Sequence, residues 1–246
     1  MNVMVLGATK GIGRAVARAM VTRGDRLHLL GRDPEELARS ARDLQVRAHA
    51  AMPVTWSLCD LGRPETFGSV VREADAALGG CDTAVITAGL FGTQDALEAD
   101  RALAARVLTL DFVNTVLLCE ELRELFLRRG GGTLCVFGSV AGDRGRKPVV
   151  LYGAAKAGLS RYLEGLDHRF RSRGLRTVCI KPGFVRTSMT EGLEPPPFAA
   201  EPEDVVPGVL AALDRGTPVA YVPAIWAAIM LAIRLLPRAV LRRVDF

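Results

Sequence analysis

The chain alternates between short apolar runs and longer amphipathic segments along nearly its whole length. The runs typical of strands are residues 2–6, 27–30, 54–58, 83–87, 133–137, 176–181 and 219–222. The segments with helical spacing of apolar residues are 11–23, 34–47, 63–78, 103–129, 150–171 and 201–215. Because a helix follows each strand, the strands should run parallel with crossover helices. We therefore predict an α/β fold, a Rossmann-type doubly wound parallel sheet of about seven strands flanked by helices.

Composition narrows the classes of function. The 246 residues are 49% hydrophobic and 24% charged, which is ordinary for a folded domain with a sizeable core. The net charge of +5 comes without a long basic run, and only 6% of residues are aromatic. These features favour an anionic ligand or an anionic membrane surface over nucleic acid.

The cysteines and the first residues indicate the compartment. The cysteines are Cys59, Cys81, Cys119, Cys135 and Cys179. They are scattered and lack metal-ligand spacing, so we expect buried, reduced thiols and no metal site. The opening MNVMVLG has no charged region and cleavage site, so a signal peptide is not expected and the protein is predicted to be cytoplasmic.

A glycine-rich loop follows the first expected strand and opens the first expected helix, at Gly7-Ala-Thr-Lys-Gly11-Ile-Gly13. Glycines in this place let the backbone approach a pyrophosphate and direct helix N–H groups at it. The second expected strand ends in Gly31-Arg32, where an acidic residue would bind the ribose of NAD. Arg32 and Lys10 therefore favour NADP(H) over NAD(H). The alternatives are a glycine turn without a ligand and a solvated arginine.

The stretch from Ser139 to Lys156 carries the candidate chemistry. Ser139 follows an expected strand, and Tyr152 and Lys156 are spaced i and i+4 at the start of an expected helix. Their side chains should share one helix face, where the ammonium favours the phenolate. The pair fits a proton donor or acceptor beside a cofactor, and it also fits an ordinary exposed helix face.

In order and spacing, these motifs resemble the short-chain dehydrogenase/reductase family, single-domain branch. The matching positions are residues 7–13, 59–61, 88–89, 139, 152–156 and 182–187. The resemblance implies an NAD(P)-binding Rossmann domain at residues 1–222, followed by a helical tail at residues 223–246. It also implies a small-molecule carbonyl substrate and a homodimer or homotetramer.

The resemblance implies a role for each matching residue. The residues that would bind the cofactor are Gly7, Thr9, Lys10, Gly11, Ile12, Gly13, Arg32, Asp60, Leu61, Ala88, Gly89, Tyr152, Lys156, Pro182, Gly183, Val185 and Thr187. Tyr152 would be the general acid in ketone reduction. Lys156 would lower its pKa and hold the nicotinamide ribose, while Ser139 would stabilise the developing charge on the substrate oxygen.

Two departures from the family pattern carry expectations of their own. Asp111 stands where the family has an asparagine that holds a relay water near the lysine. We expect Asp111 to bind this water, or Asn114, one turn away, to substitute for it. Ile86-Thr87 replaces Asn-Asn, so Thr87 is the candidate for a hydrogen bond across the sheet.

The substrate and the tail leave several hypotheses open. The substrate is a 3-oxoacyl thioester or small ketone, or else a lipid-linked keto-sugar at a membrane surface; a non-catalytic NADP-binding regulator is the third hypothesis. A proline-rich segment, residues 194–198, falls where a substrate lid could lie. The apolar part of the tail, residues 224–236, is too short to span a bilayer. Its arginines suit an interfacial helix, and packing on the domain or in a homo-oligomer fits equally well.

Overall fold

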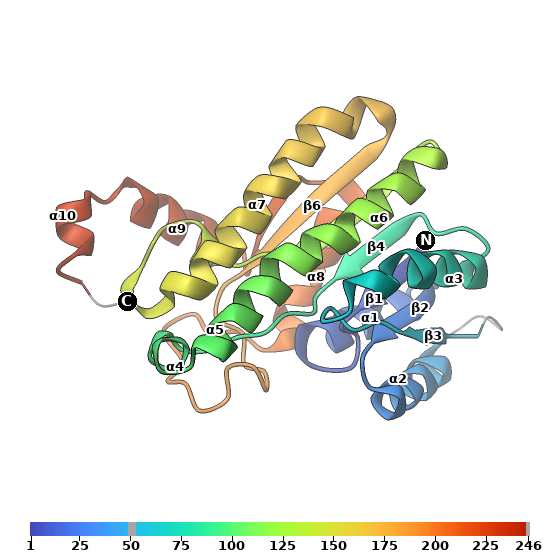
Figure 1. Ribbon diagram of the computed structural model, residues 1–246, viewed down its shortest axis with the longest axis horizontal. Coiled ribbons are helices and arrows are strands. Elements are labelled where there is room, and N and C mark those ends of the chain that lie inside the picture. Colours follow the sequence, from blue (N-terminus) through green and yellow to red (C-terminus); the bar gives the residue numbers. More distant parts are fainter. Residues whose placement is uncertain (49–52, 245–246) are drawn as a thin grey trace.

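The structure is a computed structural model and describes residues 1–48 and 53–244. Within these residues, seven strands form one parallel sheet in the order β3-β2-β1-β4-β5-β6-β7 (Figure 1). The strands are β1 (Asn2–Leu6), β2 (Arg26–Gly31), β3 (Thr55–Leu58), β4 (Thr83–Ile86), β5 (Gly132–Phe137), β6 (Leu175–Pro182) and β7 (Val219–Val222). The predicted doubly wound α/β fold is confirmed.

The helices follow the predicted alternation with two differences. They are α1 (Gly11–Thr22), α2 (Pro34–Arg47), α3 (Phe67–Leu78), α4 (Gln94–Ala99), α5 (Arg101–Leu108), α6 (Thr115–Arg128), α7 (Val150–Phe170), α8 (Pro202–Arg215), α9 (Ile225–Leu235) and α10 (Arg238–Leu241). The helix predicted at residues 103–129 starts earlier and is interrupted by a π-helical turn, η2 (Thr109–Asn114). Helix α4 was not predicted, because its six residues are too short for a clear periodicity.

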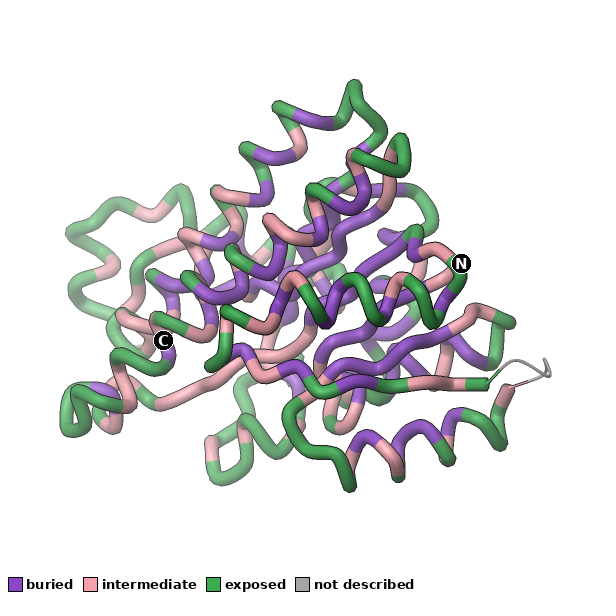
Figure 2. The backbone as a smooth tube through the Cα atoms, turned by 45° about the vertical axis from the view of Figure 1, so that its right-hand side comes forward, coloured by how far each residue is buried: buried purple, intermediate pink, exposed green. Residues whose placement is uncertain are grey.

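The sheet separates two hydrophobic cores. In β1, Val3 and Val5 face the core shared with α1, α2 and α8, while Met4 and Leu6 face the core shared with α3, α6 and α7. Successive strand residues point to opposite faces, so a sheet covered on both sides needs continuous apolar strands. The central strands are accordingly buried along most of their length (Figure 2).

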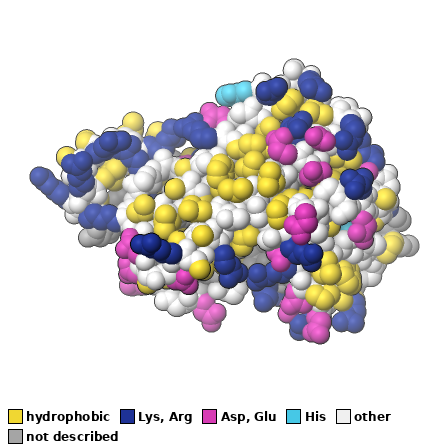
Figure 3. Space-filling model, in the orientation of Figure 1, with side chains coloured by type: hydrophobic (Ala, Val, Ile, Leu, Met, Phe, Trp, Pro, Cys, Tyr) yellow, Lys and Arg dark blue, Asp and Glu magenta, His cyan; other side chains and the backbone are white. Residues whose placement is uncertain are grey.

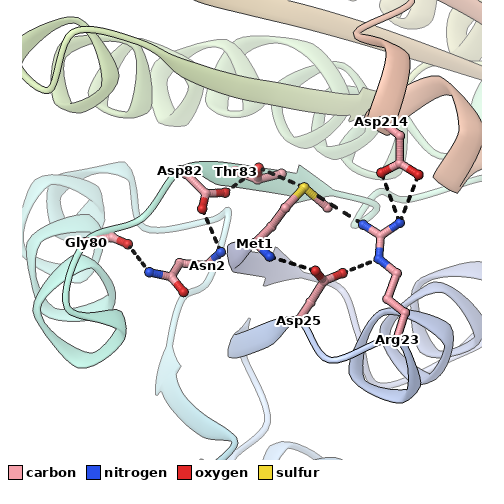
Figure 4. A network of polar contacts seen from close by, with 8 residues as sticks. All are labelled: Met1, Asn2, Arg23, Asp25, Gly80, Asp82, Thr83 and Asp214. Carbon is pink, nitrogen blue, oxygen red and sulfur yellow. Dashed lines mark hydrogen bonds and ion pairs between the residues drawn. The ribbon is translucent and has the colours of Figure 1, made fainter.

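Polar contacts tie the amino-terminal edge of the sheet together (Figure 4). The α-amino group of Met1 lies 2.8 Å from Asp25 Oδ1, and the Asn2 N–H donates to Asp82 Oδ2 at 2.8 Å. Arg23 pairs with Asp25 and also with Asp214, at 3.0 Å, from the end of α8. Functional sites of parallel sheets lie at the opposite, carboxyl edge. This network therefore fixes the sheet without occupying the edge where a ligand binds.

The strand order reverses between β1 and β4. Successive crossovers run outward from these two strands in opposite directions, which opens a crevice at their carboxyl ends. Thr87, directly after β4, donates its hydroxyl to the carbonyls of Leu6 and Gly7, at 3.0 and 3.2 Å. The cross-strand hydrogen bond expected of Thr87 is thus present, and it holds the two sides of the crevice together.

One helical stretch of the described chain, Arg101–Arg128, is long and apolar enough to cross a membrane by length and composition. A core helix of a water-soluble domain has the same two features. Leu118, Leu122 and Phe126 of this stretch are buried in the core beneath α6. These contacts make α6 one of the helices that cover the sheet.

Candidate active site

The glycine loop between β1 and α1 has the conformation that its composition predicts. Gly7 and Gly11 have φ angles of 96° and 51°, which side chains disfavour. A Cβ on Gly13 would lie 2.2 Å from the Gly7 carbonyl oxygen. Among described residues, no side chain caps the start of α1, and its first turn has no acidic residue. The loop therefore offers a close backbone cradle and helix N–H groups, which fit the pyrophosphate of a dinucleotide.

The segment after β6 lies against this loop. A Cβ on Gly11 would lie 3.1 Å from Thr187 Cγ2, so the two segments are in near contact although far apart in sequence. Pro182, the last residue of β6, and Val185 are buried, and both line the same cavity as Thr187. The predicted cofactor residues from the two halves of the chain thus meet at the crevice between β1 and β4.

The adenosine end of the predicted site is more open. Arg32 and Lys10 are both exposed, at the end of β2 and in the glycine loop. The Asp60 carboxylate accepts the Gly62 N–H at 2.8 Å, which fixes the turn after β3. Leu61 is buried next to Asp60. These residues form an open edge with two cations available to a ligand.

Tyr152, Lys156 and Ser139 meet at the carboxyl end of β5. Lys156 Nζ lies 5.6 Å from the centroid of the Tyr152 ring and donates to the Phe137 carbonyl at 3.3 Å. The Ser139 hydroxyl accepts the Ala141 N–H at 3.1 Å, and Ser139 lines the same cavity as Tyr152 and Lys156. The two helix residues therefore share one face, as their spacing predicts, and this face points to the serine.

An aromatic contact and nearby charges define the environment of Tyr152. Phe91 packs edge-on against its ring, with the centroids 5.1 Å apart. Burial raises the pKa of Tyr152, and the Asp111 carboxylate adds to this rise. The Lys156 ammonium and the Ser139 hydroxyl lower the pKa but do not overcome burial. The expected lowering by Lys156 is therefore only one contribution, and in this structure the net shift of the Tyr152 pKa is upward.

Asp111 lies behind the lysine, on the π-helical turn η2. Its Oδ1 accepts the Leu90 N–H at 2.6 Å, and its Oδ2 lies 3.4 Å from Lys156 Nζ. The side chain is completely buried. π-Helical turns often occur at functional sites. This one directs Asp111 toward Lys156.

Burial and charge act in opposite directions on the Asp111–Lys156 pair. Burial would lower the pKa of Lys156, but the nearby Asp111 and Tyr152 raise it above its ordinary value. Burial raises the pKa of Asp111, against the attraction of Lys156. Lys156 is thus kept in its charged form, with Asp111 as its direct partner.

Asn114 does not take the role proposed for it beside the lysine. Its amide Nδ2 donates to the Leu61 carbonyl at 2.6 Å in a buried position. The side chain therefore braces the turn on the adenosine side of the crevice. Asp111 and Asn114 both lie on η2, but their side chains have different partners, the Leu90 N–H and the Leu61 carbonyl.

A cavity of about 800 Å³ opens in front of Ser139, Tyr152 and Lys156. From the predicted set it is lined by Ile12, Gly89, Asp111, Ser139, Tyr152, Lys156, Pro182, Gly183, Val185 and Thr187. Its remaining walls are largely apolar, with Phe184, Leu193 and Phe198 among them. The proline-rich segment at residues 194–198 contributes to one wall, where a lid was predicted. The cavity can hold a nicotinamide together with an apolar substrate.

The tail forms another wall of the same cavity. Trp226 and Met230 of α9 are buried, and Trp226, Ile229 and Ile233 line the cavity. A Cβ on Gly183 would lie 1.9 Å from Trp226 Nε1, so only glycine allows this packing. No described residue accepts a hydrogen bond from the buried Trp226 N–H. The inner face of α9 therefore packs on the domain at the site itself.

Sequence reasoning missed Phe91, Trp226 and Arg146, which all line the cavity. Phe91 lies two residues after the matched Ala88-Gly89 pair, so its position only weakly indicates that it lines the cavity. Trp226 stood out as part of the apolar tail, but its contact with Gly183 depends on how the tail folds back. Arg146 lies in a loop whose spacing gave no signal.

Comparisons with known proteins agree with this geometry. The sequence model of the family described as short chain dehydrogenase matches residues 1–197. A protein of Mycobacterium tuberculosis named as an uncharacterized oxidoreductase is 36% identical over 241 residues, covering 98% of this chain and 96% of that protein. The 3-oxoacyl-[acyl-carrier-protein] reductase of Bos taurus is 28% identical over 189 residues, 77% of each chain. A short chain dehydrogenase structure from Shigella flexneri, complexed with NADP, has a TM-score of 0.78 and 26% identity, covering 89% of this chain and 95% of that one.

Proposed function

Because the chain belongs to the short-chain dehydrogenase family, we propose that it is an NADP(H)-dependent reductase that converts a ketone to a secondary alcohol. The observation that carries this proposal is the convergence of Ser139, Tyr152 and Lys156 on one wall of a large cavity. The glycine cradle of α1 lies at the same crevice, so a bound cofactor would have its reactive end beside these side chains. A non-catalytic regulator would have no use for this arrangement.

In this proposal, three side chains of the protein supply the proton and stabilise the charges that develop. NADPH, when bound, supplies the hydride. Ser139 is placed to donate a hydrogen bond to the substrate oxygen, which stabilises the negative charge that develops there. Tyr152 is placed to protonate this oxygen, because its raised pKa keeps the phenol protonated at neutral pH. Lys156, held charged beside Asp111, then stabilises the phenolate that remains.

The preference for NADP(H) rests on charge at the open end of the crevice. Arg32 and Lys10 are exposed where a 2′-phosphate would lie in this fold. Guanidinium groups bind phosphate through paired hydrogen bonds. The family resemblance assigns the remaining contacts of the cofactor to Gly7, Thr9, Asp60, Ala88 and Thr187, among the residues named above.

The apolar cavity favours a substrate with a long or bulky apolar part. The bovine relative is named for reduction of a 3-oxoacyl chain, and this substrate class fits such a cavity. A lipid-linked keto-sugar is the alternative. It is favoured by the tail, whose outer face exposes Leu231 and Leu235 next to a cluster of arginines. We accordingly propose a cytoplasmic enzyme that can dock on a membrane surface through α9, and that assembles into homo-oligomers.

A cofactor-binding measurement tests the preference for NADP(H). NADPH should bind much more tightly than NADH to the full-length chain. Arg32→Ala should reduce this difference by roughly tenfold, since it removes a charge-assisted bond to phosphate. Arg39→Ala is the matched control, because Arg39 is exposed on α2 and pairs with Glu36.

Equal affinities for NADPH and NADH in the unaltered protein would contradict the cofactor proposal. The reaction itself is tested by NADPH oxidation with keto-sugars, 3-oxoacyl thioesters and quinones. Failure of all three classes, with NADPH bound, would favour the regulatory alternative.

A further inference from the structure

A second cavity, of about 360 Å³, lies beside the catalytic one. Its lining residues are Arg144, Gly145, Arg146, Lys147, Arg238, Leu241, Arg242 and Val244. Five of these eight residues are cationic, and none of the described lining residues is acidic. We call this cavity the basic cleft.

Two segments far apart in sequence form the basic cleft. One is the loop at residues 144–147, which leads into α7, and the other is α10 with the residues after it. Arg144 Nη2 donates to the Leu236 carbonyl at 3.1 Å and so ties the loop to the end of α9. Figures 1 and 3 show α10 projecting from the body of the domain, with Lys and Arg side chains gathered over it.

Asp143 immediately precedes this loop; burial lowers the pKa of Arg146, and the Asp143 carboxylate raises it. Asp143 pairs with Lys181 and accepts the Tyr221 hydroxyl at 2.7 Å. It therefore faces β6 and β7. A concave surface lined with cations attracts an anion, and arginine side chains bind phosphate oxygens in pairs.

The basic cleft adjoins the cavity in front of Tyr152. Arg146 lines both cavities. The inner face of α9, with Ile229 and Ile233, forms an apolar wall of the catalytic cavity, and α10 follows it directly. A substrate with its carbonyl at Tyr152 could thus extend along apolar walls toward the cations.

The phosphates of the cofactor do not account for this surface. The glycine cradle and Arg32 belong to β1, α1 and β2, whereas α10 lies at the other end of the domain (Figure 1). We propose that the basic cleft binds a phosphate ester carried by the substrate, remote from the ketone that is reduced. This inference rests on the proposed function for the reaction at Tyr152. A coenzyme A thioester and a prenyl phosphate share the required chemistry.

Two ketones that differ in phosphate content test the proposal. Acetoacetyl-coenzyme A carries phosphates, and the acetoacetyl thioester of N-acetylcysteamine presents the same ketone without them. The unaltered protein should have the higher kcat/KM for the coenzyme A thioester. The ratio of interest is kcat/KM for the coenzyme A thioester divided by kcat/KM for the neutral thioester. In the double variant Arg238→Gln/Arg242→Gln, this ratio should fall roughly tenfold, mainly because KM for the coenzyme A thioester rises. Arg243→Gln, outside the cleft lining, should leave the ratio unchanged.

Binding measurements without turnover separate the two sources of phosphate. Farnesyl phosphate and pantetheine 4′-phosphate are titrated into the full-length protein, with farnesol and pantetheine as neutral partners. Binding of farnesyl phosphate alone that depends on Arg238 and Arg242 supports a lipid-linked substrate. Binding of pantetheine phosphate alone that depends on the same arginines supports a thioester.

The remaining outcomes distinguish the proposed phosphate site in the basic cleft from the proposed ketone reduction. If neither phosphate probe depends on Arg238 and Arg242, and the ratio of kcat/KM values does not change, the basic cleft is not a substrate site. Reduction of the neutral thioester would then still uphold the proposed function. If no ketone is reduced but a phosphate probe binds through these arginines, the proposed reaction fails while the anion site stands.

Discussion

Asp111 places a carboxylate where the family pattern has an asparagine. An asparagine can accept the Leu90 N–H equally well, so this hydrogen bond does not require a charge. The charge acts instead on Lys156, 3.4 Å away, whose pKa it raises, and on Tyr152, whose pKa it also raises. We therefore expect Asp111 to act as a positioning residue that adjusts the pKa of Tyr152, the proposed proton donor, through electrostatics.

Asp111→Asn should shift the pH dependence of ketone reduction to lower pH. Reduction needs the protonated phenol, so activity declines as the pH rises through the pKa of Tyr152. Removing the Asp111 charge lowers this pKa, and the decline should begin at lower pH than in the unaltered protein. The measurement is the pH profile of kcat with NADPH saturating.

Asp95→Asn serves as the control, because Asp95 lines the same cavity from α4 but is exposed. Its profile should match that of the unaltered protein. If the pH profile of Asp111→Asn also matches that of the unaltered protein, the electrostatic role of Asp111 is wrong.

Helix α9 has one buried face and one exposed apolar face. Trp226 and Met230 are buried against the domain, whereas Leu231 and Leu235 are 57% and 75% exposed. The inward packing expected as one alternative for the tail is therefore present. The outer face remains available for a membrane interface, and Arg234 and Arg238 lie near its end.

Leu231→Gln/Leu235→Gln should weaken binding to anionic vesicles without unfolding the tail. The substitutions remove apolar contact on the outer face and leave the inward residues intact. Liposome flotation of the full-length chain measures the effect. Val46→Gln is the control, since Val46 is 88% exposed on α2. Equal flotation of all three proteins, or no flotation of any, would contradict a membrane role for α9.

The elements of this fold differ in how well their sequence predicts them. The strands and the glycine loop are local patterns, and the chain shows them where residues 2–6 and 7–13 predict them. The pairing of Tyr152 with Lys156 is equally local. Their meeting with Ser139 follows from the parallel topology, because the carboxyl ends of neighbouring strands share one edge.

The parts that the sequence did not predict depend on contacts between distant segments. From the π-helical turn at residues 109–114, Asp111 reaches Lys156, whereas Asn114 binds the Leu61 carbonyl. The fit of Trp226 over Gly183, and the loop and tail of the basic cleft, appear only after the tail folds back. The spacing of apolar residues and the composition of a segment do not indicate which distant segments it will contact.

The molecule as a whole exposes apolar side chains on the side of the sheet covered by α5, α6 and α7. Hydrophobic atoms gather in the middle of this face (Figure 3). Val113 and Leu117 are 48% and 45% exposed there, although the same helical segment packs into the core with its other face. An exposed apolar surface of this kind is typical of subunit interfaces. In the homo-oligomer proposed above, we expect this surface to contact a second copy of the chain.

Leu117→Lys should convert the oligomer to smaller species. A charge in the middle of an apolar interface must be desolvated on association, which strongly disfavours assembly. Light scattering coupled to size-exclusion chromatography measures the mass. Val46→Lys, on the other side of the sheet, should keep the mass of the unaltered protein. A monomeric unaltered protein, or a Leu117→Lys oligomer of unchanged mass, would contradict this interface.

The central claim is that Tyr152 donates the proton in an NADPH-dependent reduction. Its most direct test is single-turnover reduction by Tyr152→Phe with NADPH already bound, compared with Tyr162→Phe. Tyr162 lies on the same helix but donates to Glu120, outside the cavity. Reduction should fall about a thousandfold in Tyr152→Phe, with the affinity for NADPH largely retained, and remain unchanged in Tyr162→Phe. Turnover by Tyr152→Phe at the rate of the unaltered protein would contradict the account.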